Sequence, residues 1–220
     1  MPDLLRVGVL VSGGGSNLQA LVDACRAGAI PAEIAVVISN VPAAFALVRA
    51  RQCGIPAAVF DHRTFGSPEA FEAEVRAALD RQRVGLVCLA GFLRILSPGF
   101  VDAFAGRIMN IHPALLPAFG GKGMYGERVH RAVLAAGVRI SGCTVHFVTA
   151  VTDGGPIIAQ AAVPVEDDDT PQTLAARVGR EERRLYPLAV ALFAQGRLGI
   201  EGNRVRTLPA LGAGVIPGTR

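Results

Sequence analysis

The chain has 220 residues, of which 51% are apolar and 18% are charged. That is enough to bury one large core or two small ones, and we predict one domain. No uninterrupted apolar stretch approaches the roughly 20 residues of a membrane-spanning helix, and Asp3 and Arg6 interrupt the N-terminus before a signal-peptide run develops. These features favour a cytoplasmic protein with no membrane partner.

The net charge of +4 suits anionic small molecules. The arginines are scattered and the chain has two tyrosines and no tryptophan, so we expect no nucleic-acid partner. The cysteines lie far apart and lack the close pairs of a zinc site, which predicts reduced core residues and no bound metal. They are Cys25, Cys53, Cys88 and Cys143.

Short apolar runs alternate with longer segments of helical period, the pattern of a parallel sheet with helices on both faces. The predicted strands are 5–11, 33–38, 56–60, 84–90 and 107–111. The predicted helices are 17–27, 42–53, 68–82 and 98–105. We therefore predict an α/β fold with a doubly wound sheet.

After residue 140 the alternation of strand-like and helical segments stops. The runs "ISGCTVHFV" and "GPIIAQAAVPV" are separated only by a turn-rich stretch around Asp153 to Pro156, which predicts an antiparallel pair added to the sheet.

A long helix is predicted from Pro171 to Gln195, with Thr170 as its cap. Pro187 is expected to kink or split this helix. Its apolar face is expected to carry Leu174, Val178, Leu185 and Leu188. The final twenty residues, 201–220, are rich in Gly, Pro and Ala and predict a C-terminal tail without regular elements.

The stretch "VSGGGSNLQAL" passes from the first strand into a helix through three glycines. Exposed amides at a helix start bind phosphate, and glycines let a ligand approach the backbone. The stretch lacks the third glycine of the dinucleotide fingerprint and the Gly-Lys-Ser/Thr of a nucleoside triphosphate loop, so it favours a single phosphate. The alternative is a tight strand-to-helix turn capped by Ser16.

The stretch "RIMNIHPALLP" places Asn110 and His112 two residues apart, so they face the same side if the strand continues through His112. An amide can donate to a developing oxyanion, and an imidazole can donate or accept a proton. The alternative is a turn in which both side chains are structural.

In "VTDGGPI", Asp153 sits on a turn before a strand. A carboxylate there could orient His112 and favour its protonated form. An Asp followed by two glycines is also typical of a plain turn.

Four motifs occur in order: the glycine turn after the first strand, "AGFLRILSP" after the fourth, "NIHPALLP" after the fifth and "DGGPII" in the added pair. Together they resemble the family of folate-dependent phosphoribosylglycinamide (glycinamide ribonucleotide) formyltransferases over roughly residues 5–200. The resemblance implies the formyltransferase fold, a Rossmann-like, doubly wound, mostly parallel sheet extended by an antiparallel pair. It also implies one formyltransferase domain over residues 1–200, whose N-terminal half binds the nucleotide phosphate and whose C-terminal half binds folate and carries catalysis.

Site residues are carried over by the resemblance, position by position. The implied catalytic residues are Asn110, His112 and Asp153. The implied ribonucleotide-binding residues are Gly14, Gly15, Ser16, Asn17 and Glu182. The implied folate-binding residues are Leu93, Arg94, Ile95, Leu96 and Asn110, largely through backbone groups. For Glu182, the residues alone leave open a charge on a solvated helix face.

The implied reaction transfers the formyl group of the co-substrate 10-formyltetrahydrofolate to the amine of glycinamide ribonucleotide, in de novo purine biosynthesis and without a metal. A formyltetrahydrofolate hydrolase and a methionyl-tRNA formyltransferase are disfavoured, because each carries a further domain for which this chain has no room. A non-catalytic phosphate- or nucleotide-binding module is the alternative from another class. A monomer and a homodimer fit equally.

The chain departs from the family in three places. Ala114 stands where a serine is commoner, and Pro68 stands where some bacterial members have an arginine. The segment 118–128 differs in length and composition from several relatives and is predicted to be a mobile loop near the site. Lys122 and His130, in or next to it, receive no assigned role.

Overall fold

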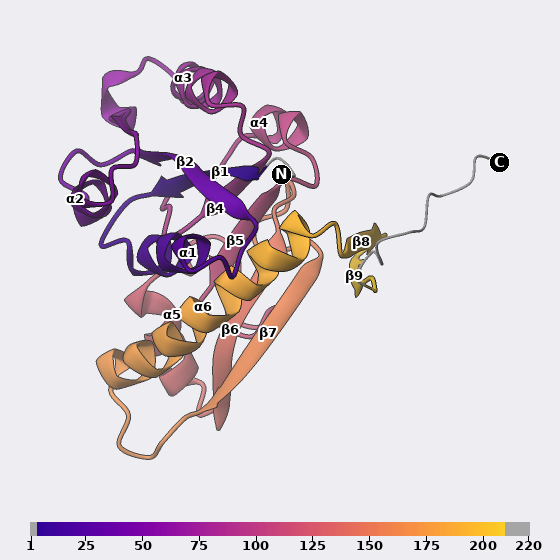
Figure 1. The fold of residues 1–220 in the computed structure, drawn as a ribbon. Coiled ribbons are helices and arrows are strands. Elements are labelled where there is room, and N and C mark those ends of the chain that lie inside the picture. The colour runs from indigo at the N-terminus through magenta and orange to yellow at the C-terminus, as the bar shows by residue number, and fades with distance from the viewer. Residues whose placement is uncertain (1–3, 210–220) are drawn as a thin grey trace.

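The computed structural model describes residues 4–209, which build one nine-stranded sheet with helices packed against it (Figure 1). The elements are, in chain order, β1 (Leu5–Val11), α1 (Ser16–Arg26), β2 (Ala32–Ser39), α2 (Phe45–Gln52), β3 (Ala57–Val59), the short 3-10 helix His62–Thr64, α3 (Pro68–Arg81), β4 (Leu86–Leu89), α4 (Pro98–Ala103), β5 (Ile108–His112), α5 (Glu127–Ala135), β6 (Ile140–Phe147), β7 (Ile157–Pro164), α6 (Pro171–Ala194), β8 (Leu198–Glu201) and β9 (Arg204–Thr207). The strands lie side by side in the order β3-β2-β1-β4-β5-β6-β7-β9-β8.

Strands β1 to β5 are parallel to one another, which confirms the predicted doubly wound α/β fold. The strand order reverses between β1 and β4. At such a reversal the two connections leave toward opposite faces of the sheet, and a crevice opens beyond the carboxyl ends of the strands.

Both faces of the parallel part of the sheet are buried by helices. In β1, Val7, Val9 and Val11 belong to the apolar cluster that includes α1, α5 and α6, whereas Leu10 belongs to the cluster that includes α3 and α4. This alternation follows from the two-residue period of a strand. The parallel strands therefore read as continuous apolar runs in the sequence.

The C-terminal half extends the sheet. β6 is antiparallel to both β5 and β7, which confirms the predicted added pair. Helix α6 runs across β5, β6 and β7 (Figure 1), and its Tyr186 hydroxyl lies within hydrogen-bond distance of the carbonyl oxygens of Leu89 (3.1 Å) and Met109 (2.9 Å). Since those residues belong to β4 and β5, this contact ties the helix to the strands that carry the site.

Helix α6 corrects one expectation and narrows another. It is continuous through Pro187 rather than split, and Leu188 is exposed whereas Leu174, Val178 and Leu185 are buried as predicted. Ala189 follows Val178 by eleven residues, or about three helical turns, so Ala189 rather than Leu188 continues the buried face. Thr170 caps the helix together with Thr173, as a capping box.

The prediction of a tail without regular elements is partly wrong, because residues 201–207 belong to a hairpin of β8 and β9. The two residues between these strands, Gly202 and Asn203, are a typical two-residue hairpin turn, with Gly202 at a φ of 60°. Residues 210–220 of the expected tail lie outside the described residues.

All four cysteines are free, as predicted. Cys88 and Cys143 are buried, but Cys25 and Cys53 are only partly buried against the core, so the expected core placement holds for two of them. Within residues 4–209 no helix is both long enough and apolar enough to cross a membrane.

Candidate active site

A cavity of about 860 Å³ lies beyond the carboxyl ends of β1, β4 and β5, where the strand order reverses. Every residue assigned to the site from the sequence lines this cavity. These residues are Gly14, Gly15, Ser16, Asn17, Leu93, Arg94, Ile95, Leu96, Asn110, His112, Asp153 and Glu182. Segments far apart in the chain therefore meet in one place.

The glycine turn, Gly13–Gly15, is held from behind by α2. The Ala46 amide donates to the Gly13 carbonyl at 3.0 Å and Arg49 Nε donates to the Gly14 carbonyl at 2.9 Å. Gly15 has a φ of 73°, and a Cβ there would lie 2.7 Å from the Ala46 Cβ. The turn consequently requires glycine at this position, both for its left-handed backbone and for the close approach of α2.

Helix α1 begins without a side-chain cap. Its N-cap is Gly15 and no side-chain hydrogen bond closes the end, so the alternative in which Ser16 caps the helix is wrong. The first-turn amides are therefore available to an anion and carry the positive end of the helix dipole. A smaller hollow of about 310 Å³ beside this turn is lined by Ser16, Arg49 and Arg183, among others, which adds two cationic side chains.

Asn17 and Glu182 form a polar pair between α1 and α6. Asn17 Nδ2 donates to Glu182 Oε2 at 3.0 Å. Burial raises the pKa of the Glu182 carboxyl, and the hydrogen bond from Asn17 opposes that shift. Asn17 Oδ1 is buried without a hydrogen-bond partner among residues 4–209. The Glu182 carboxylate thus lines the cavity and is held by Asn17, which differs from a charge on a solvated helix face.

The segment Leu93–Leu96 lies between β4 and α4 with no regular secondary structure. Leu93 and Ile95 are exposed, whereas Leu96 is buried. The segment therefore adds apolar side chains to the lining of the cavity.

β5 delivers Asn110 and His112 to the cavity on the same side of the strand, as the two-residue spacing predicts. His112 is only 4% exposed. Its Nε2 donates to the Phe119 carbonyl at 2.8 Å, and its Nδ1 lies 3.6 Å from Asp153 Oδ2. Both ring nitrogens therefore face hydrogen-bond acceptors.

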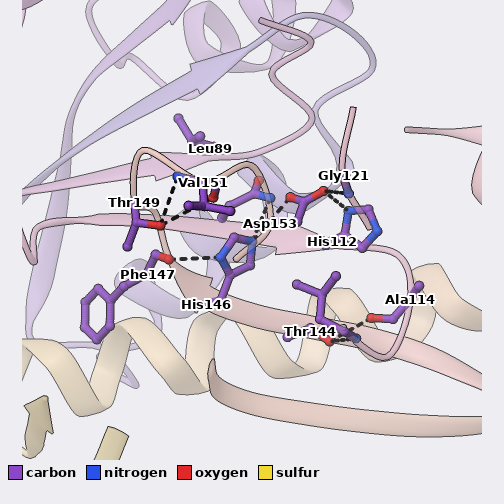
Figure 2. A network of polar contacts seen from close by, with 12 residues as sticks. Leu89, His112, Ala114, Gly121, Thr144, His146, Phe147, Thr149, Val151 and Asp153 are labelled. Carbon is purple, nitrogen blue, oxygen red and sulfur yellow. Dashed lines mark hydrogen bonds and ion pairs between the residues drawn. The ribbon is translucent and has the colours of Figure 1, made fainter. Parts of the chain in front are cut away.

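Asp153 lies between two histidines and a loop amide (Figure 2). Its Oδ2 accepts a hydrogen bond from the Gly121 amide at 2.8 Å and faces His112, and its Oδ1 lies 3.7 Å from His146 Nε2. Asp153 has a φ of 55°, and a Cβ at Gly155 would lie 1.9 Å from the Phe147 carbonyl oxygen. The Asp-Gly-Gly stretch is therefore a turn, as the structural interpretation predicted. It also places the Asp153 carboxylate next to the His112 ring, as the functional interpretation predicted.

His146 belongs to the site and was not recognised in the sequence. Its Nδ1 donates to the Phe147 carbonyl at 2.9 Å, and its Nε2 lies 3.2 Å from Asn110 Nδ2. Burial lowers the pKa of His146, which favours the neutral ring, so Nε2 is the acceptor for the Asn110 amide. His146 lies opposite Asn110 in the pairing of β5 with β6. The sequence pattern does not predict the register of two strands, so it could not bring these residues together.

The loop before α5 contacts the two central side chains. The Phe119 carbonyl accepts from His112, and the Gly121 amide donates to Asp153. Lys122 and His130 also line the cavity. His130 is 4% exposed, its Nδ1 is buried without a partner in residues 4–209, and burial lowers the pKa of its ring. Helix α5, which carries His130, was not predicted.

The cavity combines a candidate anion site at the glycine turn with two side-chain hydrogen-bond donors on β5. Amide donors at the glycine turn can hold a phosphate, while Asn110 and His112 can donate to an oxygen that gains negative charge. Among residues 4–209, no group of three or more His, Cys, Asp or Glu side chains is placed to hold a metal ion.

Comparison with known proteins shows close relatives. Residues 5–190 match the family described as Formyl transferase. The phosphoribosylglycinamide formyltransferase of Escherichia coli (strain K12) is 45% identical over 199 residues, which are 90% of this chain and 92% of that protein. The crystal structure of glycinamide ribonucleotide transformylase 1 from Symbiobacterium toebii superposes with a TM-score of 0.90 at 50% identity, covering 95% of this chain and 96% of the other.

Larger proteins contain a similar segment. The trifunctional purine biosynthetic protein adenosine-3 of Gallus gallus is 46% identical over 192 residues, which are 87% of this chain and 19% of that protein. The chain thus spans about a fifth of the length of that curated relative.

Proposed function

Because the chain belongs to the formyl transferase family, we propose that it transfers the formyl group of 10-formyltetrahydrofolate to the amine of glycinamide ribonucleotide. The products are formylglycinamide ribonucleotide and tetrahydrofolate, and the reaction is a step of de novo purine biosynthesis. Relatives with close to half of their residues identical carry the corresponding names. The partners we propose are these two small molecules.

One observation carries the proposal: the glycine turn and the Asn110, His112 and Asp153 side chains open into the same cavity. The ribonucleotide phosphate binds the free amides at the start of α1, with Arg49 and Arg183 beside it. Glu182 and Asn17 bind polar groups of the same substrate. The folate occupies the side of the cavity formed by Leu93–Leu96.

Asn110 and His112 stabilise the transition state. The substrate amine attacks the formyl carbon, and the formyl oxygen gains negative charge as the carbon becomes tetrahedral. Asn110 donates to this oxygen through its side-chain amide. His112 donates through its Nε2–H, which must first leave the Phe119 carbonyl, while its Nδ1 stays on Asp153. Losing one such donor costs around a hundredfold to a thousandfold in rate, or roughly 3–4 kcal/mol.

Asp153 aims His112 and balances its charge. Its Oδ2 lies 3.6 Å from Nδ1 of the ring, a separation at which opposite charges attract strongly in a buried setting. As the intermediate collapses, the C–N bond to the folate breaks, and the proton of the attacking amine passes to the leaving folate nitrogen through water. No further side-chain base is required.

Steady-state formyl transfer tests the proposal with purified protein, both substrates and release of tetrahydrofolate as the signal. We expect turnover that requires the ribonucleotide, and a kcat in His112→Ala lower by about a hundredfold or more. Deformylation at the same rate without the ribonucleotide would make the protein a hydrolase. Binding of ligand without any turnover would support the binding-module alternative.

A further inference from the structure

The segment Leu93–Leu96 presents unpaired backbone groups to the cavity. Within residues 4–209 the backbone groups of Arg94, Ile95 and Leu96 form no hydrogen bond, and these residues line the cavity. Free N–H and C=O groups at a cavity wall suit a flat heterocycle with donors and acceptors along its edge. An irregular segment of this kind keeps its shape only if its two ends are held.

Ser12 holds the first end. Its hydroxyl accepts a hydrogen bond from the Leu93 amide at 2.8 Å and donates to Asn40 Oδ1 at 2.6 Å. The Ser12 amide also donates to the Gly91 carbonyl at 3.0 Å. Ser12 and Asn40 are both buried. Since Ser12 directly precedes the glycine turn, this contact joins the two halves of the cavity.

Glu72 holds the second end from inside the core. It lies on the buried face of α3, next to Phe71 and in line with Val75, and is 6% exposed. Its Oε1 accepts from the Ser97 amide at 2.7 Å, and its Oε2 accepts from the Ser97 hydroxyl. The same hydroxyl accepts from the Phe100 amide at 3.2 Å and so caps α4.

A carboxylate at this position is costly. The neighbouring buried side chains of α3 are apolar, and an apolar residue would bury there without the loss of hydration that a carboxylate suffers. Both oxygens of Glu72 are used by Ser97, the residue that follows Leu96. The carboxylate therefore fixes where the Leu93–Leu96 segment ends.

We propose that Ser12 and Glu72 are positioning residues that hold the two ends of the Leu93–Leu96 segment, so that its free backbone groups are set in advance for the folate. The inference rests on the proposed function, because it takes the folate to be the molecule that this segment binds. Holding the segment in its bound shape removes an ordering cost that would otherwise weaken binding. Neither residue touches the reacting atoms.

Two measurements on the full chain test this inference. Calorimetric titration with 5-formyltetrahydrofolate gives the folate Kd without turnover, and steady-state assays give kcat and the KM of each substrate. The variants are Glu72→Ala, Glu72→Gln and Ser12→Ala, with Glu74→Ala as the matched control, because Glu74 is exposed on the same helix. The midpoint of thermal unfolding is recorded for each variant.

We expect Glu72→Ala to raise the folate Kd and the folate KM about tenfold, while kcat and the ribonucleotide KM stay within about twofold. Glu72→Gln should recover most of the affinity, because its amide can still accept from the Ser97 N–H and donate to the Ser97 hydroxyl. Ser12→Ala should raise the folate Kd about threefold to tenfold, and Glu74→Ala should match the wild type.

Wild-type folate affinity in folded Glu72→Ala and Ser12→Ala proteins, or an equal rise of both KM values in Glu72→Ala, would overturn the inference. If the wild type binds 5-formyltetrahydrofolate but transfers no formyl group, the proposed function fails and the titrations still decide the positioning role. If the wild type does not bind the folate at all, both proposals are wrong.

Discussion

At the scale of single residues, the centre of the site is a chain of side chains in which each one orients the next. The Phe147 carbonyl fixes the tautomer of His146, whose Nε2 then fixes the side-chain amide of Asn110. Asp153 faces the rings of both His112 and His146. Because the His146 ring donates from Nδ1 to the Phe147 carbonyl, the Asp153 carboxylate remains available to His112.

Two substitutions of His146 distinguish its role as a hydrogen-bond acceptor from the space that its ring fills. His146→Phe keeps a ring but leaves the Asn110 amide without its partner, so we expect kcat to fall about threefold to tenfold with both KM values unchanged. His146→Gln retains an acceptor and should lose less. Equal kcat values for the two variants in the formyl transfer assay would show that the contact with Asn110 does not matter.

Replacing Asp153 by Asn keeps the size and removes the charge that faces His112. We expect kcat to fall roughly a hundredfold, because the ring loses its orientation and its counter-charge, while both KM values stay within a few-fold. The rate is measured in single-turnover experiments, so that product release does not hide the chemical step. A single-turnover rate close to that of the wild type would exclude the role proposed for Asp153.

At the scale of elements, the glycine turn is set by the packing of α2 against it. Gly15 and Gly28 make a matched pair: both have φ values near 70°, but a Cβ at Gly15 would meet Ala46 whereas nothing lies within 4 Å at Gly28. Gly28→Ala should lower the free energy of unfolding by about 1–2 kcal/mol, because alanine resists the left-handed backbone. Gly15→Ala should lower it further, because Ala46 must also shift. Only Gly15→Ala should raise the ribonucleotide KM, since only there must α2 move.

Urea denaturation and steady-state kinetics on the two glycine variants check this prediction. If Gly28→Ala raised the ribonucleotide KM as much as Gly15→Ala did, the effect would come from lost stability rather than from the shape of the turn.

The helices and strands that the sequence predicts correctly are those with a clear hydrophobic period or a clear capping residue. The five apolar runs before residue 112 each form a strand, and the capped helix begins at Pro171. The hairpin of β8 and β9 was missed because its strands are only four residues each and alternate weakly, although the Gly202–Asn203 turn was a usable signal. Helix α5 was missed because the glycine-rich loop before it reads as irregular.

At the scale of the whole molecule, two buried histidines make stability depend on pH. Burial lowers the pKa of His130 and of His146, whereas an unfolded histidine titrates near 6.5. Below about pH 7 the unfolded chain binds protons at these rings that the folded chain does not, so the free energy of unfolding falls as pH falls. Each ring contributes a slope of up to about 1.4 kcal/mol per pH unit.

Urea denaturation between about pH 5.5 and pH 7.5 measures this slope. His146→Gln should show a shallower decline than the wild type, since one of the two titrating rings is gone. Glu182 acts in the opposite direction, because its raised pKa costs stability as pH rises above the ordinary value for a glutamate. A slope that is the same in the wild type and in His146→Gln would mean that His146 is not the group responsible.

The fold class could be predicted from sequence because hydrophobic period and chain order determine a doubly wound sheet with few alternatives. The placement of Asn110 beside His112 followed from strand geometry. Two other contacts, between Asp153 and His112 and between Asn17 and Glu182, depend on how distant segments pack. Local pattern could not predict them, and the family resemblance indicated only that these residues share one site. His146 and Glu72 needed the structure itself, because register and helix packing bring them to their partners.

The central claim is that the formyl group moves to the ribonucleotide amine rather than to water. The measurement that tests it most directly is a single turnover with a formyl donor labelled with carbon-13 at the formyl carbon, followed by NMR of the products. We predict that the label appears as the formamide of the ribonucleotide, with no more free formate than in a sample without protein. Label recovered as formate in the presence of saturating ribonucleotide would contradict the account.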